Sequence, residues 1–309
     1  MSFKIIFMGT PDFAVPILKT LYQTGHKILE VYTQPPKKKN RGQKITISPI
    51  HKYSNEINIP VRHPLTLSTR EELEHFKKTK PDIVIIVAYG KILPPELLNL
   101  EKILFINVHA SLLPKWRGAA PIQRSIMNCE NKTGVSIMKL VPKLDAGPLL
   151  LKSEIKFTRR TDYQELSNQM SQLGSKLILD ALELINNDEA KFIPQIEEEA
   201  TYAKKIEKAE SKINWKSDAK NIVAKINALN PNPGTWFKLK GLRIKVTKAI
   251  EVEAKGLPGE IINEEFTVGC LQNAVQILEL KKEGKNKMTT KEFLKGSKLE
   301  VGSNLIDNV

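Results

Sequence analysis

Short apolar runs alternate with amphipathic segments over the first two thirds of this 309-residue chain, and this alternation constrains the fold more than any other feature. The apolar runs are long enough for buried strands, and the segments between them are long enough for crossover helices. This pattern is typical of a mostly parallel sheet with helices on both faces. The expected strands lie at residues 4–8, 28–32, 82–88, 103–108 and 135–141, and a helix is expected at 13–20.

A long helix is expected to end this region. Thr161 and Gln164 have the spacing of a capping box, and apolar residues follow at intervals of three and four up to Leu184. We therefore expect a doubly wound α/β domain over residues 1–186. Residues 187–212 carry mixed charges and few apolar side chains, so they are expected to form a linker.

Residues 213–309 show a different pattern. One helix is expected at 217–229, and short strand patterns separated by turns follow it. Several short strands at close spacing predict a small β-barrel of the OB-like kind. The expected strands are 235–239, 242–248, 259–262, 265–270 and 274–280, followed by a short helix at 290–294.

Missing motifs exclude several classes of protein. A dinucleotide-binding turn needs three glycines after the first strand, but only Gly9 is present there, and no phosphate-binding loop motif occurs. Cys129 and Cys270 are far apart, so neither a disulfide framework nor a thiolate metal site is expected. No apolar run approaches the roughly 18 residues of a membrane span. The first residues lack a signal-peptide pattern, and we therefore expect a cytoplasmic protein.

The chain is strongly basic, with 48 Lys and Arg against 34 Asp and Glu and a formal net charge of +14. Three basic runs with few or no acidic residues are spread over both predicted domains, which favours nucleic-acid phosphates as the partner. A solvated charged surface is the alternative for any one run. The first run, expected to be a flexible loop because it contains prolines and a glycine, includes Lys37, Lys38, Lys39, Arg41 and Lys44. The second includes Lys238, Lys240, Arg243, Lys245 and Lys248, and the third spans residues 281–298.

Polar side chains gather where buried strands are expected to end. Asn107 and His109 are two positions apart, so in extended geometry they project to the same side. Asp145 lies in a loop with Gly and Pro after the 135–141 strand. An amide and an imidazole can stabilise a developing oxyanion, and a carboxylate can orient the imidazole. Alternatively, the three residues are a structural histidine and two turn formers, and spacing alone does not separate these interpretations.

Several segments carry motifs of one known family. They include Asn107-Val-His109, Ser111-Leu-Leu-Pro-Lys-Trp-Arg-Gly-Ala-Ala-Pro121 and Leu-Asp145-Ala-Gly-Pro. Phe7-Met-Gly-Thr-Pro-Asp-Phe-Ala14, Ala88-Tyr-Gly-Lys-Ile-Leu-Pro94, Thr201-Tyr-Ala203 and Leu229-Asn-Pro-Asn-Pro233 with Trp236 add to them. In these motifs, which extend over essentially the whole chain, the sequence resembles the 10-formyltetrahydrofolate-dependent formyltransferases.

This resemblance implies a catalytic domain that binds 10-formyltetrahydrofolate and an OB-like domain that helps to hold tRNA. The implied reaction transfers the formyl group to the α-amino group of initiator methionyl-tRNA, giving N-formylmethionyl-tRNA and tetrahydrofolate, without a metal. Asn107 and His109 would stabilise the tetrahedral oxyanion, and Asp145 would polarise His109 and help to deprotonate the amine. Ser111, Leu112, Leu113 and Pro114 match the folate-binding segment, Ala88, Tyr89 and Gly90 would wall the pterin pocket, and Arg41 and Lys44 match a basic loop that contacts the tRNA acceptor end. The resemblance also implies a monomer.

Three other functions remain open at this point. A formyltransferase of the same family could act on glycinamide ribonucleotide or on a nucleotide-sugar amine, and an inactive relative could bind RNA on the same scaffold. An enzyme for glycinamide ribonucleotide would normally end near the first domain, and a sugar enzyme gives less reason for basic runs on both domains. The presence of Asn107, His109 and Asp145 together argues against an inactive protein.

Overall fold

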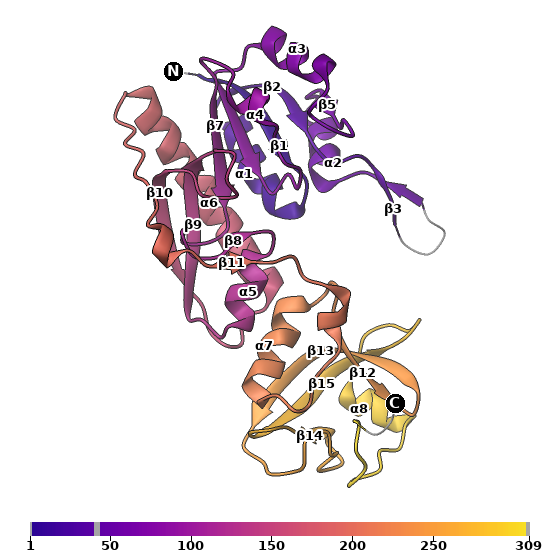
Figure 1. Cartoon of the computed structure of the whole chain (residues 1–309). Helices are drawn as coiled ribbons and strands as arrows, with labels where there is room; N and C mark the ends of the chain where they lie inside the picture. Colours follow the sequence, from indigo (N-terminus) through magenta and orange to yellow (C-terminus); the bar gives the residue numbers. More distant parts are fainter. Residues whose placement is uncertain (1, 40–43, 307–309) are drawn as a thin grey trace. The chain divides into compact units, whose positions relative to one another are not determined.

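The computed structural model describes residues 2–39 and 44–306 (Figure 1). They divide into two compact units, each built from segments that are distant in the sequence. The first unit comprises Met1–Pro121, Thr133–Ile155 and Ser167–Ala203, and the second comprises Ile122–Lys132, Lys156–Leu166 and Lys204–Val309. The domain boundaries expected at residues 186 and 213 stay predictions. Among the described residues, no helix is long and apolar enough to cross a membrane.

A seven-stranded sheet forms the centre of the first unit, in the order β10-β9-β7-β6-β1-β2-β5. From β5 to β7 each strand is parallel to its neighbours, and β9 runs antiparallel to β7. β1 and β6 are buried along almost their whole length, because a parallel sheet covered on both faces needs apolar side chains on both. The strands are β1 (Lys4–Gly9), β2 (Lys27–Tyr32), β5 (Val61–Arg62), β6 (Ile83–Val87), β7 (Leu104–His109), β9 (Lys132–Lys139) and β10 (Leu149–Lys156).

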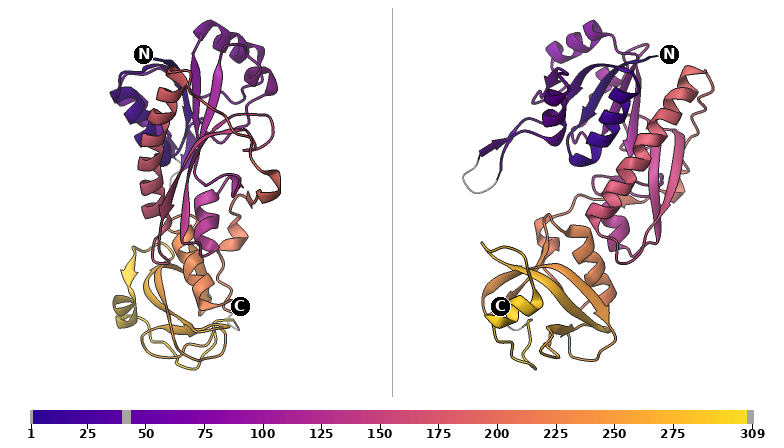
Figure 2. Two further views of the ribbon diagram at one scale, coloured as in Figure 1. Left: turned by 90° about the vertical axis from the view of Figure 1, so that its left-hand side faces the viewer. Right: turned by 180° about the vertical axis from the view of Figure 1, so that it is seen from behind.

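Helices cover both faces of this sheet (Figure 2). On one face, a Cβ at Gly174 of α6 would lie 3.2 Å from Val108 and 3.3 Å from Ile17 of α1, so the glycine allows close packing. On the other face, Phe76 of α3 and Leu97 of α4 belong to a core cluster with residues of β1 and β6. The predicted doubly wound α/β fold is confirmed. The helices up to residue 186 are α1 (Val15–Gln23, after a 3-10 turn at Asp12–Ala14), α2 (Pro49–Glu56), α3 (Arg70–Thr79), α4 (Pro95–Leu98), α5 (Pro121–Met127) and α6 (Tyr163–Asn186). Of these, α5 belongs to the second unit except for its first residue.

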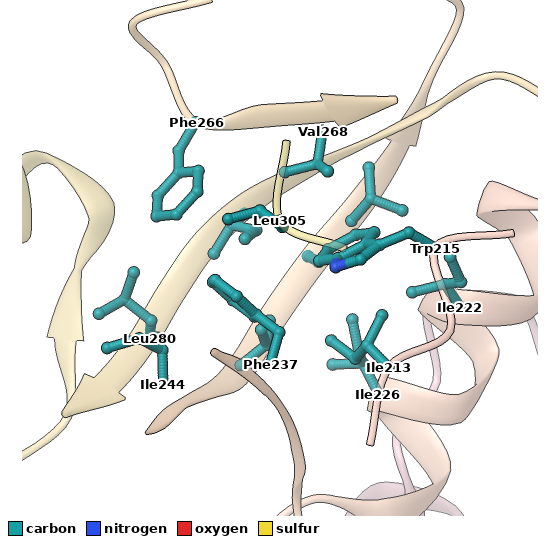
Figure 3. Close-up of a cluster of buried hydrophobic side chains, with 14 of the residues drawn as sticks. Ile213, Trp215, Ile222, Ile226, Phe237, Ile244, Phe266, Val268, Leu280 and Leu305 are labelled. Atoms are coloured by element: carbon teal, nitrogen blue, oxygen red, sulfur yellow. The ribbon is translucent and has the colours of Figure 1, made fainter. Parts of the chain in front are cut away.

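An antiparallel sheet forms the second unit, in the order β12-β13-β15-β14 with β16 beside β15. Its core is aromatic: the ring of Phe237 meets those of Trp215 and Phe266 edge-on, at centroid distances of 5.6 and 5.8 Å (Figure 3). Ile222 and Ile226 of α7 complete this core. The small β domain expected after the α/β domain is confirmed. Its elements are α7 (Ala219–Leu229), β12 (Thr235–Leu239), β13 (Leu242–Val252), β14 (Thr267–Gly269), β15 (Ala274–Lys282), β16 (Met288–Thr289) and α8 (Thr290–Lys295).

Some local predictions differ from the structure. The N-cap of α6 is Asp162, whose carboxylate accepts from the backbone N–H of Glu165 at 2.9 Å, whereas the hydroxyl of Thr161 accepts from the N–H of Thr158. Residues 259–262 form only isolated bridges, because a proline and a glycine at 258 and 259 interrupt the strand pattern. β10 was not expected from the sequence as a full strand, since its exposed and buried residues alternate and leave no continuous apolar run.

The first basic run is another difference. It was expected to be a flexible loop, but β3 (Lys37–Lys39) pairs antiparallel with β4 (Lys44–Thr46), so its two ends form a short hairpin. β-Branched Ile45 and Thr46 favour this extended backbone. Arg41 lies outside the described residues.

Candidate active site

The end of β7 carries two of the expected catalytic side chains. Asn107 and His109 are 8% and 6% exposed, in a strand that is otherwise apolar. Asn107 lies beside Ile86 of β6, and His109 lies opposite Ser136 of β9. The carboxyl end of a central parallel strand is the edge at which open α/β sheets bind their ligands.

Two groups lie against the imidazole of His109. Its Nε2 is 2.9 Å from the backbone oxygen of Trp116, and its Nδ1 is 3.7 Å from Oδ2 of Asp145. A carbonyl oxygen only accepts, so Nε2 carries a proton and donates it to this bond. Nδ1 therefore faces Asp145 with a lone pair in the neutral ring, and with a second proton in the charged ring.

Asp145 is held in an unusual backbone conformation. Its φ angle is +46°, in the left-handed region that non-glycine residues rarely adopt. Its Oδ2 accepts from the N–H of Gly118 at 2.8 Å. Two positions further on, a Cβ at Gly147 would collide with the carbonyl oxygen of Lys139, so this close approach requires glycine. The loop therefore presents the Asp145 carboxylate in a fixed place beside His109.

The imidazole of His109 and the carboxylate of Asp145 are adjacent, and Asn107 lies two positions before His109 on the same strand. An amide N–H and a protonated imidazole can donate to an oxygen that gains negative charge, and a nearby carboxylate can accept a proton. Within the described residues, no group of three or more His, Cys, Asp or Glu side chains could hold a metal ion. The chemistry these three residues can support is acyl transfer to a nucleophile.

The expected folate-binding segment follows β7 directly. The hydroxyl of Ser136 donates to the carbonyl of Ser111 at 2.7 Å and accepts from the N–H of Leu113 at 3.1 Å. Ser111 uses its own hydroxyl to bond the carbonyl of Lys115 at 2.6 Å. Ser111, Leu113 and Pro114 are buried, and Leu112 is partly exposed. Hydrogen bonds to Ser136 of β9 and to Lys115 thus hold the segment in place.

Residues 88–90 follow β6, the strand next to β7, and so reach the same edge of the sheet. Ala88 and Gly90 are exposed and have φ angles of +48° and +79°. The ring of Tyr89 is buried in the core, and burial raises the pKa of its phenol. The carbonyl oxygen of Tyr89 accepts from Thr10 at 2.9 Å and from Gln34 at 3.1 Å. Tyr89 therefore shapes this turn through its backbone.

Gln34 also connects the turn at residues 88–90 to the basic hairpin. Its side-chain oxygen accepts from Nζ of Lys37 at 2.6 Å, while its amide nitrogen donates to the carbonyl oxygens of Tyr89 and Gly90. The start of β3 is thus fixed beside the expected folate turn. This anchor determines where the hairpin that contains Lys38, Lys39 and Lys44 leaves the sheet.

Part of the second basic run lies on β12 and β13 next to Lys281 of β15. We call Lys238, Arg243, Lys245 and Lys281 the cation cluster. Lys238 lies opposite Arg243, and Lys245 lies opposite Lys281 of β15. The guanidinium of Arg243 lies 4.3 Å from the centroid of the Trp236 ring. Burial lowers the pKa of Lys245, and the positive charges of Arg243 and Lys281 lower it further. These cations therefore repel one another, and an anion between them would relieve the repulsion.

Two other lysines expected on this surface lie outside the cluster. Lys240 is 3.3 Å from a carboxylate oxygen of Glu300, so its charge is partly neutralised. Lys248 lies beside Glu279 in the register between β13 and β15. Both are exposed. The net positive charge is therefore unevenly distributed along the predicted basic run. Lys240 and Lys248 lie near carboxylates, whereas the residues of the cation cluster lie next to other cations.

The sequence analysis did not identify the residues that surround the catalytic group. They include Trp116 and Gly118, which act through backbone atoms, and Gln195, which lies in the expected linker. In the structure, β11 (Tyr202–Ala203) pairs with β8 (Arg117–Gly118), so this part of the expected linker packs in the first unit. No periodic pattern marks such contacts, because each depends on one backbone group.

A model of the formyl transferase family matches residues 3–182, and a model of the formyl transferase C-terminal domain matches residues 205–298. The chain belongs to the formyl transferase family. A protein of Pelagibacter ubique (strain HTCC1062) that is named methionyl-tRNA formyltransferase is 48% identical to this formyltransferase, over 99% of each chain.

Solved structures support the fold of this formyltransferase. HypX from Aquifex aeolicus, in complex with tetrahydrofolic acid, matches 98% of this chain and 51% of its own with a TM-score of 0.66 and 20% identity. A methionyl-tRNA formyltransferase from Clostridium thermocellum matches 81% of this chain and 94% of its own, with a TM-score of 0.56 and 18% identity. The chain is thus an enzyme of formyl transfer with the fold expected from its motifs.

Proposed function

We propose that this formyltransferase transfers the formyl group of 10-formyltetrahydrofolate to the α-amino group of initiator methionyl-tRNA. The observation that carries the proposal is the 48% identity with the Pelagibacter ubique enzyme, since it covers both units and therefore both the candidate active site and the cation cluster. The products are N-formylmethionyl-tRNA, which serves translation initiation, and tetrahydrofolate.

In the proposed mechanism, bound 10-formyltetrahydrofolate supplies the formyl group, and the side chains at the end of β7 act on it. Nδ1 of His109 and Oδ2 of Asp145 are 3.7 Å apart, too far for a direct hydrogen bond, so a substrate group that lies beside the pair can bond to both. Asn107 and protonated Nδ1 donate to the formyl oxygen as the amine adds and charge develops. Asp145 stabilises the protonated ring, takes a proton from the attacking nitrogen and returns it to the departing folate nitrogen.

The residues at this edge fit a folate. The turn at Ala88–Gly90 and the segment Ser111–Pro114, which is hydrogen-bonded to Ser136 of β9, follow neighbouring strands, so a flat pterin ring can lie between two backbone walls. Pockets for such ligands are usually preformed and combine apolar walls with a few polar groups. These seven residues would hold the ring, and Asn107 and His109 would face its formyl group.

The basic surfaces fit the tRNA. The cation cluster, with Lys240 and Lys248 at its borders, would contact phosphates, and Arg243 on Trp236 presents a planar cation on an aromatic ring. In the first unit, the hairpin with Lys37, Lys38, Lys39 and Lys44 would contact the acceptor end together with Arg41. The presence of basic residues in both units supports a long polyanion as the shared ligand.

A direct comparison of acceptors tests this proposal. The purified chain is supplied with 10-formyltetrahydrofolate and, in parallel, with methionyl-tRNA, glycinamide ribonucleotide or a nucleotide-sugar amine, and formylated product is measured. We expect turnover on methionyl-tRNA only. Turnover on a small amine without turnover on tRNA would overturn the proposal, and no turnover with any acceptor would indicate an inactive RNA-binding protein.

We also propose that the enzyme works as a monomer in the cytoplasm, as its family resemblance suggests. Light scattering of the purified chain tests the first point: a mass near the 34.9 kDa of one chain is expected. Twice that mass would contradict it. Cell fractionation tests the second.

A further inference from the structure

We propose that Arg117 and Gln195 are positioning residues that hold both groups on either side of the His109 ring. The inference rests on the proposed catalytic role of His109 and Asp145. It adds a bridge of two side chains that connects the Trp116 carbonyl with the Asp145 loop. All of its members lie in the first unit.

The bridge begins at Arg117, whose side chain is completely buried. Its Nε and Nη2 donate to the side-chain oxygen of Gln195 at 3.1 and 3.0 Å, and its Nη1 donates to Glu197 at 2.9 Å. A buried guanidinium must be paired and hydrogen-bonded, so these acceptors fix the position of the side chain. Because Trp116 precedes Arg117 directly, this also restrains the carbonyl that bonds Nε2 of His109.

The other end of the bridge is the amide nitrogen of Gln195. It donates to the carbonyl oxygens of Asp145 and Gly147, at 2.9 and 2.7 Å. Since the oxygen of this amide faces a guanidinium and the nitrogen faces two carbonyls, only one orientation of the amide satisfies all four bonds. The amide therefore holds the left-handed Asp145 loop by its backbone, while the N–H of Gly118 holds the carboxylate.

These contacts close a ring around the catalytic group. From Nε2 of His109 it passes through Trp116 and Arg117 to Gln195, and then through Asp145 back to Nδ1 of His109. This closed series of contacts determines which nitrogen of the neutral imidazole carries the proton. It also determines the distance between Asp145 and the other nitrogen. A misplacement of such groups by about 1 Å can cost about 100-fold in rate.

Gln195→Glu tests the bridge most sharply, because the shape of the side chain is retained. One carboxylate oxygen still accepts from Arg117, but the other can no longer donate and faces two carbonyl oxygens. We expect kcat with methionyl-tRNA to fall about 10- to 100-fold while the KM for either substrate changes little, since the binding surfaces are untouched. Gln195→Met, a neutral variant that removes the same donor, is expected to give a similar fall.

A spectroscopic measurement on the enzyme without substrates tests positioning directly. Nitrogen NMR of labelled imidazoles distinguishes the two tautomers, and His109→Gln identifies the signal of His109 among the five histidines. We expect the wild-type ring to be protonated at Nε2 when neutral. In Gln195→Glu and Gln195→Met we expect a mixture of tautomers. A merely structural residue would lower the melting temperature without changing the tautomer.

Gln272→Glu is the matched control, because it makes the same change at an exposed glutamine of the second unit. It is expected to leave kcat and the His109 signal unchanged. Unchanged kcat and tautomer in both Gln195 variants would overturn the inference, as would failure of both to fold. If Asp145→Asn were fully active, the proposed catalytic function would fail instead. If Asp145→Asn were inactive while both Gln195 variants stayed active, only the positioning role of Arg117 and Gln195 would be contradicted.

Discussion

The candidate active site and the cation cluster use charge in opposite ways. In the candidate active site, His109 is buried and Asp145 is largely buried, and each is hydrogen-bonded to a neutral backbone group. In the cation cluster, Arg243 is exposed, Lys245 is partly buried, and the positive charges of Arg243 and Lys281 act on Lys245 more strongly than the negative charge of Glu283. His109 and Asp145 are hydrogen-bonded within the protein, whereas the cation cluster holds like charges side by side, although Nζ of Lys245 donates to the carbonyl oxygen of Pro233.

This difference follows from what each region must do. Hydrogen-bond donors that are already in place stabilise a transition state best, because they need no reorganisation during the reaction. A surface binds a phosphate backbone more tightly through cations that the protein does not neutralise, because each contact releases counterions from the nucleic acid. Substitutions at the two regions should therefore separate the effects on kcat from those on tRNA binding, and the predictions below test that separation.

The largest effect is expected from Asp145→Asn. It keeps the shape of the side chain and an oxygen for the Gly118 N–H, but removes the charge and the proton acceptor. We expect kcat to fall on the order of 100- to 1,000-fold, with tRNA affinity unchanged. Single-turnover kinetics and filter binding measure the two quantities.

Asp180→Asn is the control for this variant, because it makes the same change on the exposed side of α6. It should have wild-type kcat. A parallel loss of tRNA affinity in Asp145→Asn would break the comparison, since it would mean that the buried site also contributes to holding the polyanion.

Gly147→Ala is expected to have the next largest effect. Its Cβ would meet the carbonyl oxygen of Lys139, and backbone must move to relieve the contact. Overpacking of this kind costs about 1 to 3 kcal/mol of unfolding free energy, and it would also shift the Asp145 loop and lower kcat. Urea denaturation and kinetics test both effects.

Gly296→Ala at the end of α8 offers a matched substitution in the second unit, where a Cβ would meet nothing within 4 Å. It should leave stability and kcat nearly unchanged. If Gly147→Ala were equally neutral, the Asp145 loop would be adaptable, and the contrast between a rigid and an open region would be lost.

The sequence predicted much of this architecture. The strands around β1, β6 and β7 were predictable because each is buried on both faces and reads as a continuous apolar run. The strands expected at residues 235–239 and 242–248 were also predictable, and β12 and β13 begin at these positions. β10 was missed for the opposite reason, since a half-exposed strand lacks such a run.

The candidate site was predictable only in part. Asn107, His109 and Asp145 stand at strand ends and in a Gly/Pro loop, which sequence patterns reveal. The carbonyl of Trp116 and the amide of Gln195 could not be found, because every residue has a carbonyl and a glutamine in a polar stretch has no distinguishing pattern. Likewise, the pairing of Lys240 with Glu300 depends on a contact across 60 positions of sequence.

Arg243→Ala tests the cation cluster. It removes a cation stacked on Trp236, and we expect tRNA affinity to fall about 10-fold and the salt slope of binding to decrease by about 1, with kcat unchanged at saturation. Lys240→Ala should have a smaller effect, because Glu300 already neutralises part of its charge. Equal effects of the two would show that pairing within the protein does not determine which cations bind.

The smallest effect is expected at the ion pair between Glu210 and Arg124, both in the second unit. Glu210 accepts hydrogen bonds from Arg124 at 2.7 and 3.0 Å, and these hold its pKa below the ordinary value. A carboxylate with a lowered pKa in the folded state adds stability above its unfolded pKa of about 4.3, and this stability is lost as pH falls through the folded pKa. Glu210→Gln should therefore lower the unfolding free energy by about 0.5 kcal/mol at neutral pH, since the pair is only partly buried, and by less in acid.

Urea denaturation at neutral and acid pH measures this difference, and tRNA affinity should not change in the same variant. The absence of any loss at either pH would instead indicate that Glu210 acts only through its bond to the Glu207 N–H, which a neutral side chain can also make. The expected pattern would complete the contrast: cations paired within the second unit stabilise its fold, whereas those left unpaired in the cation cluster remain available to the phosphates of a ligand.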